Sequence, residues 1–114
     1  MIEAGKLRHR IDLESYVDSQ DSHGDDVKDW TTFAASIPAE IVGSGGRELF
    51  RAQQTFPEAN AVIKIRYLAG VDTRMRVYHP AEGVYYNVLN VGHDDDSRRE
   101  ALILTCQSGV SDDA

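Results

Sequence analysis

The chain contains one cysteine and no long hydrophobic run, and these two absences exclude several classes of protein. Cys106 alone cannot form an internal disulfide in a chain of 114 residues, so we expect synthesis in a reducing cytoplasm. No apolar run approaches the roughly 18 residues that a membrane helix needs, and the first residues lack the apolar segment of a signal peptide. The length predicts a single domain, residues 1–114, with one small core.

Positive charge is also scarce. Twelve Lys and Arg residues stand against 19 Asp and Glu residues, and the net charge of −7 argues against wrapping nucleic acid with the whole surface. One local exception exists, because alternate residues of two expected strands are cationic. If those strands are neighbours, one exposed sheet face carries four cations, which either pair with nearby acids or face an acidic subunit or a nucleic-acid phosphate. These residues are Lys64, Arg66, Arg74 and Arg76.

Motifs for catalysis, cofactors and metals are missing as well. The glycine-rich run from Gly43 to Gly46 precedes an expected helix but lacks the Lys-Ser/Thr pair of a phosphate loop. His93 and the three aspartates that follow are consecutive, so they cannot easily converge on one ion. Cys106 lies in an apolar strand with no evident base beside it. We therefore expect no enzyme, no cofactor and no metal site.

Alternation of apolar and polar residues predicts a mainly β protein. The expected strands are 7–17, 30–42, 61–68, 74–78, 84–91 and 101–107, with an exposed acidic loop at 19–29 and a disordered tail at 108–114. Pro38 places the second strand at an edge or next to a bulge. The pattern favours a small antiparallel β-barrel of five to six strands. The predicted core comprises Leu13, Phe33, Ile37, Ile63, Ile65, Val88, Ile103 and Leu104.

The stretch from Gly43 to Pro57 is the one place where the spacing becomes helical. Ser44 or a glycine can serve as the N-cap, Glu48 lies in the first turn, and Pro57 ends a helix of about three turns. An apolar stripe of Leu49, Ala52 and Phe56 predicts that the helix lies on the sheet. Because glycines precede the helix and a turn follows it, we expect residues 43–60 to be a mobile helical insertion between strands two and three.

Several short motifs follow one another along the chain: Gly5-Lys-Leu-Arg-His-Arg-Ile11, Trp30 before Ala35-Ser-Ile37, Gly46-Arg-Glu-Leu-Phe50, Ala52-Gln-Gln54, Ile65-Arg-Tyr67, Met75-Arg-Val77 and Tyr86-Asn-Val88. Taken in this order, they resemble one family, the head-tail connector proteins of tailed bacteriophages, also called head closure or stopper proteins. The resemblance implies a β-barrel whose mobile insertion follows the second strand. It also implies a virion protein, made in the bacterial host cytoplasm, that forms a ring in the neck, closes the DNA-filled head and joins it to the tail.

The partners implied are copies of the chain, the portal and adaptor proteins, and a tail completion or tail tube protein. Double-stranded DNA would pass through the ring without sequence-specific binding, and no membrane is involved. The expected subunit or channel interface comprises Gly45, Gly46, Arg47, Glu48, Leu49, Phe50 and Arg51, together with Lys64, Arg66, Arg74 and Arg76.

A different class of function remains open at this stage. An OB-like module for single-stranded nucleic acid would stack bases on tyrosines beside the basic sheet face. The candidate tyrosines are Tyr67, Tyr78, Tyr85 and Tyr86. Net negative charge weighs against this alternative, and strongly salt-dependent DNA binding would favour it.

Overall fold

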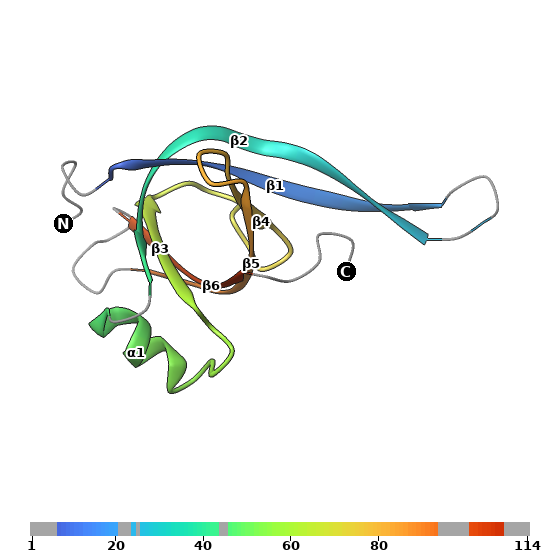
Figure 1. Ribbon diagram of the computed structural model, residues 1–114. Coiled ribbons are helices and arrows are strands. Elements are labelled where there is room, and N and C mark those ends of the chain that lie inside the picture. Colours follow the sequence, from blue (N-terminus) through green and yellow to red (C-terminus); the bar gives the residue numbers. More distant parts are fainter. Residues whose placement is uncertain (1–6, 21–23, 25, 44–45, 94–100, 109–114) are drawn as a thin grey trace.

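Six strands form a closed antiparallel barrel in the computed structural model, which describes residues 7–20, 24, 26–43, 46–93 and 101–108 (Figure 1). The strands are β1 (His9–Gln20), β2 (Asp26–Val42), β3 (Ala61–Arg66), β4 (Arg76–His79), β5 (Val84–His93) and β6 (Ala101–Ser108). Around the barrel their order is β1-β2-β3-β6-β5-β4. One helix, α1 (Arg47–Gln53), is inserted between β2 and β3. The predicted fold class is confirmed.

The barrel interior holds the main core. Leu13, Ile63, Ile65 and Leu104 are completely buried there, and Val88 is nearly so, as the strand phases predicted. Ile37 is partly buried and packs against the same core. The prediction is wrong for two residues, because Phe33 is 40% exposed and Ile103 belongs to a second apolar cluster outside the barrel.

Phe33 leaves the core because β2 contains extra residues relative to β1. The register of β2 against β1 shifts between the pairs Ile11↔Ile37 and Leu13↔Ala34, and it shifts again between Leu13 and Glu14. After these bulges, the alternation of residues in β2 no longer predicts which side chains face the barrel interior. Ser36 adopts a positive φ of 57°, and its N–H donates a 2.9 Å hydrogen bond to the Asp12 carboxylate. The Phe33 ring packs instead against Gly70, where an added Cβ would come within 3.1 Å of it. The irregularity predicted next to Pro38 is thus present.

A two-stranded ribbon projects from the barrel where the sequence predicted a loop at 19–29. β1 continues to Gln20, which pairs with Asp26 at the start of β2. Residues 15–20 and 26–31, called the arm below, have no other strand neighbour among the described residues. The arm extends well past the barrel, and the principal extents of the molecule are 48 × 26 × 26 Å (Figure 1). The loop prediction is wrong for residues 19–20 and 26–29, which belong to β1 and β2. Two strands that pair only with each other need no apolar alternation, so the polar sequence there did not indicate them.

The last strand, β6, is covered on both faces, as its apolar sequence predicted. Leu102, Leu104 and Cys106 point into the barrel, while Ile103 packs against the cluster that includes α1. Ser108, predicted to begin a disordered tail, belongs to β6, and its N–H donates a 2.8 Å hydrogen bond to Asn60. The rest of that tail, residues 109–114, lies outside the described residues.

Burial of Cys106 gives the first testable prediction. Desolvation raises the pKa of the Cys106 thiol well above its ordinary value of 9.0, so the folded protein keeps the thiol protonated. In the unfolded chain the thiol ionises near its ordinary pKa, so the stability that depends on the neutral thiol is present below that pH and lost above it. Unfolding in urea should show a free energy of unfolding about 1.4 kcal/mol lower at pH 10 than at pH 8 from this residue. Cys106→Ala should remove this part of the pH dependence, and an unchanged dependence would contradict the prediction.

Candidate functional site

Helix α1 lies on the outer surface of the barrel. It spans two turns rather than the predicted three, begins after Gly46 with no side-chain cap, and carries Glu48 in its first turn. Ser44, a candidate cap, lies outside the described residues. Leu49 is 3% exposed and forms a small apolar cluster with Ala59 and Val62. The partly buried residues around this cluster are Val42, Ala52, Phe56, Leu89 and Ile103. The prediction that the helix docks on the sheet is confirmed.

Gly46 is required where the chain turns from β2 into α1. Its N–H donates a 3.2 Å hydrogen bond to the Gly43 carbonyl, and its own carbonyl accepts the first helical bond from Phe50. A Cβ at Gly46 would collide with the Cγ1 of Val42, which belongs to the apolar surface under the helix. Nothing lies within 4 Å of a Cβ built on Gly43. The two glycines therefore differ in how much space surrounds them.

This difference predicts unequal effects of two alanine substitutions. Gly46→Ala should weaken docking of α1 by about 1 to 3 kcal/mol, because Val42 or the helix must shift to make room. Hydrogen exchange of the Phe50 amide, which bonds to the Gly46 carbonyl, should then become roughly 5- to 100-fold faster. Gly43→Ala is the matched control and should leave that exchange rate unchanged. Equal rates in both variants would show that the contact with Val42 does not limit docking.

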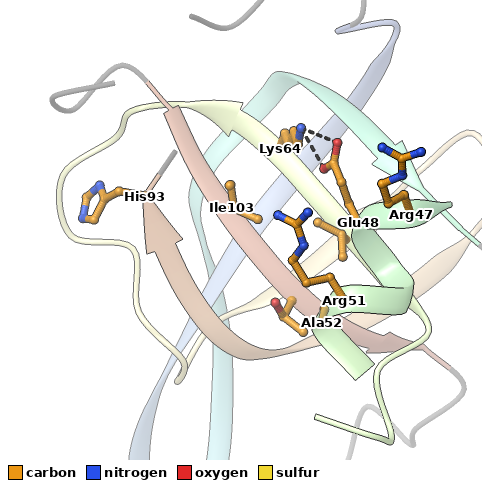
Figure 2. Close-up of a pocket in the computed structure, with 9 residues that line it drawn as sticks. Arg47, Glu48, Arg51, Ala52, Lys64, His93 and Ile103 are labelled. Carbon is orange, nitrogen blue, oxygen red and sulfur yellow. Dashed lines mark hydrogen bonds and ion pairs between the residues drawn. The ribbon is translucent and has the colours of Figure 1, made fainter. Parts of the chain in front are cut away.

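A pocket of about 430 Å³ lies between α1 and the outer faces of β3 and β6. Its lining residues are Arg47, Glu48, Arg51, Ala52, Val62, Lys64, His93, Ile103 and Thr105. Figure 2 shows Arg51 extending from α1 beside Ile103, with His93 on the other side of the pocket. Three of the lining residues are permanent cations and one is an acid, while Ala52, Val62 and Ile103 are apolar, so the pocket combines apolar residues with a net positive charge.

The one acid of the pocket is already engaged. Glu48 accepts a 2.7 Å charged hydrogen bond from the Lys64 ammonium, between side chains that are 44% and 22% exposed respectively (Figure 2). A pair this accessible contributes at most about 1 kcal/mol to stability. Arg47 and Arg51 have no ion pair within 4.0 Å among the described residues. The pocket thus presents two guanidinium groups that an incoming anion could bind.

The predicted four-cation sheet face does not form. β3 lies between β2 and β6, whereas β4 lies between β1 and β5, so the two strands are on opposite sides of the barrel. Lys64 joins the pocket and Arg66 is exposed at the end of β3. Arg74 is exposed in the turn before β4, 5.7 Å from the centre of the Tyr16 ring. Chain order suggested the wrong neighbours for these strands.

Arg76 is a structural residue at the base of the arm. Its guanidinium lies 4.0 Å from the Trp30 ring centre and 4.2 Å from that of Tyr85, and its Nε donates a 2.6 Å bond to Glu14. The residue is 6% exposed. This aromatic and ionic cluster joins β1 and β2, at the base of the arm, to β4 and β5. Sequence reasoning missed it because Trp30 and Tyr85 are far from Arg76 along the chain.

The tyrosines proposed for base stacking do not form one exposed platform. Tyr86 is 8% exposed and belongs to the barrel core, while the Tyr85 ring is covered by Arg76. Tyr67 packs instead near His93, with ring centres 6.2 Å apart. Tyr78 and Tyr85 do lie together, with ring centres 4.6 Å apart, but Arg76 lies over the Tyr85 ring. The four tyrosines therefore do not share one exposed surface.

The described residues contain neither a cluster of metal ligands nor a membrane helix. Within the described residues no group of three or more His, Cys, Asp or Glu side chains could hold a metal ion. His93 is described, but the three aspartates after it are not, so the run considered as a metal motif lies mostly outside the described residues. No helix of the described chain has the length and apolar character to span a membrane.

The geometry defines a small antiparallel β-barrel protein with an inserted helix, a cationic pocket beside that helix and a projecting arm. The chain belongs to the phage head completion protein family, whose model matches residues 2–109. It is 26% identical over 114 residues to head completion protein gp7 of Enterobacteria phage HK97, covering 96% of this chain and 98% of that protein. The solution structure of protein SF1141 from Shigella flexneri 2a superposes with a TM-score of 0.74 at 20% identity, covering 96% and 99% of the two chains.

These comparisons confirm the family indicated by the sequence motifs, and the solved structure confirms the fold. The family is one of structural phage proteins rather than enzymes, and it supports a structural role in head closure.

Proposed function

We propose that this chain forms a ring in the phage neck, where it closes the DNA-filled head and joins it to the tail. The observation that carries the proposal is the family match across almost the whole chain, together with full-length similarity to a head completion protein. The partners of such a ring are further copies of the chain, the portal and adaptor proteins, and a tail completion or tail tube protein. Its location is the virion neck.

The surface of α1 supports an interface at the residues expected from the sequence. Phe50 is 67% exposed, so a large aromatic side chain on α1 is accessible to a partner, although one exposed apolar residue does not by itself define an interface. Arg47 and Arg51 flank it on the same helix. The remaining members of the proposed interface are Gly45, Gly46, Glu48, Leu49, Lys64, Arg66 and Arg74. Arg76 is better explained by its role at the base of the arm.

The insertion at 43–60 is proposed to change position during closure. A helix of two turns is not stable alone in water, so α1 depends on its contact with the barrel. That contact rests on one fully buried helical side chain, Leu49. A neighbouring subunit could replace so small a surface, and Gly43 and Gly46 allow the backbone to follow. Net charge of −7 suits a channel through which DNA passes without being held.

The proposal can be tested by deleting the gene for this protein from the phage that encodes it. Particles made without the protein should contain filled heads that lose DNA and carry no tails, as seen by electron microscopy and by nuclease sensitivity of the packaged DNA. Supplying the wild-type chain from a plasmid should restore tailed, DNA-retaining particles. Normal yields of infectious particles in its absence would overturn the proposal.

A further inference from the structure

We propose that the acidic end of the arm of one copy binds in the cationic pocket of the next copy. The proposal deepens the proposed function, since it rests on ring formation and names the contact that forms the ring. It predicts a head-to-tail interface in which each copy contributes its arm on one side and its pocket on the other.

The arm is built as a projecting element with a firm base. A two-stranded ribbon alone is marginal in water, so its order depends on what holds its base. Tyr16 and Trp30 pack edge to face with ring centres 4.9 Å apart, and Arg76 lies over Trp30 and bonds to Glu14. This anchoring lets the ribbon reach away from the barrel as one unit.

The far end of the arm carries more acid than base. Its described strands contain Asp18 and Asp26 there and one cation, Lys28, whereas Asp29 lies nearer the base beside Trp30 and already has an interaction of its own. In the strand register Asp18 lies opposite Lys28, and Asp26, the first residue of β2, lies opposite Gln20. Val27 follows Asp26 directly, so an aliphatic residue stands next to carboxylates in the sequence.

The pocket has the complementary chemistry. Arg47 and Arg51 have no ion pair among the described residues, and Lys64 is paired with Glu48, so the net positive charge of the pocket comes from the two arginines. Ile103, which is partly buried, adds aliphatic surface to the pocket beside Arg51 (Figure 2). The pocket can therefore accept a short segment that combines carboxylates with one aliphatic side chain, as the arm does.

The arm of a subunit cannot reach its own pocket. β2 runs without interruption from Asp26 at the end of the arm to Val42, and α1 begins a few residues later, so the two features lie at opposite ends of this strand (Figure 1). A strand of this length keeps them tens of ångströms apart. Contact is therefore possible only between copies, and because arm and pocket are different surfaces, repetition leads to a ring or a filament.

A cysteine pair tests the contact directly. Asp26→Cys combined with Arg51→Cys should give a ladder of covalent multimers under mild oxidation, both with the purified chain at high concentration and in phage particles. Cys106 is buried and should not interfere. The matched control is Asp26→Cys with Glu82→Cys, since Glu82 is exposed on the β4–β5 turn across the barrel from β3. No ladder, or an equal ladder from the control, would overturn the proposal.

Charge exchange supplies an independent measurement by sedimentation velocity at low and high salt. Arg47→Glu with Arg51→Glu reverses the charge of the pocket, and Asp18→Lys with Asp26→Lys reverses the charge of the arm. Each double variant alone should self-associate at least tenfold more weakly than wild type, whereas an equal mixture should recover association, because each arm then meets a pocket of opposite charge. The proposal is contradicted if the mixture associates no more strongly than either variant alone. It is also contradicted if reversing the charge of the pocket leaves self-association unchanged and impairs only the binding of DNA or of another phage protein.

The two proposals fail in different ways. If ladders form but the chain is dispensable for DNA-retaining, tailed particles, the head-closure function is wrong and the contact stands. If the chain completes heads but its cysteine pair forms no ladder in those particles, the contact is wrong and the function stands.

Discussion

Arg76→Ala is expected to lower the free energy of unfolding by about 3 to 5 kcal/mol, because it leaves the largely buried Glu14 carboxylate without its counter-ion. The side chains of this pair are 8% and 18% exposed, and Nε lies 2.6 Å from the carboxylate oxygen. The substitution also removes the cation that lies between Trp30 and Tyr85. Since these contacts join the arm to β4 and β5, faster hydrogen exchange should spread along residues 15–20 and 26–31.

Two further variants separate charge from stacking. Arg76→Lys keeps the positive charge but loses the planar contact with both rings, so its stability should fall between those of wild type and Arg76→Ala. Arg74→Ala is the matched control, since Arg74 is exposed and its loss should cost less than about 1 kcal/mol. Urea unfolding followed by far-UV circular dichroism measures all three. A loss for Arg76→Ala no larger than that of the control would show that the cluster contributes little to stability.

The sequence predicted the barrel because most strands have one buried face. Alternation in β3 identified Ile63 and Ile65 as core, and the continuous apolar run of β6 predicted that both of its faces are covered. Helical spacing located α1 and the burial of Leu49. In each case the local sequence is sufficient to predict whether a residue is buried, because burial repeats with the period of the strand or helix.

Features that depend on pairing between distant segments could not be predicted in this way. Alternation says which face a residue occupies but not which strand lies next to it, so Arg74 and Arg76 were assigned to the same face as Lys64 although β4 is opposite β3. The bulges in β2 reversed the expected side of Phe33 without any break in the apolar pattern. The pocket likewise combines α1 with β3, β5 and β6, and His93 gives no sign in the sequence that it lies near the helix.

Joining α1 covalently to β3 is expected to abolish head closure while leaving the fold intact and keeping Arg47 and Arg51 in the pocket. Glu48 and Lys64 are suitable positions, because their charged groups already meet at 2.7 Å across the pocket edge. Glu48→Cys with Lys64→Cys, bridged by a short bismaleimide, would hold the helix in its docked position. Since the ion pair itself contributes little, the linked protein should unfold no more easily than wild type.

The reason for the expected loss is that closure is proposed to require release of α1. The helix is held to the barrel by a small apolar contact that a neighbour could replace, and the link makes this exchange impossible. The arm should still bind beside Arg47 and Arg51, so rings should assemble around heads that then leak DNA. A bridge between Ser15→Cys and Thr31→Cys, which face each other at the base of the arm, is the matched control and should permit closure. If bridged α1 closes heads as well as wild type, the helix is only a structural insertion, and the arm becomes the segment in which the closing element must be sought.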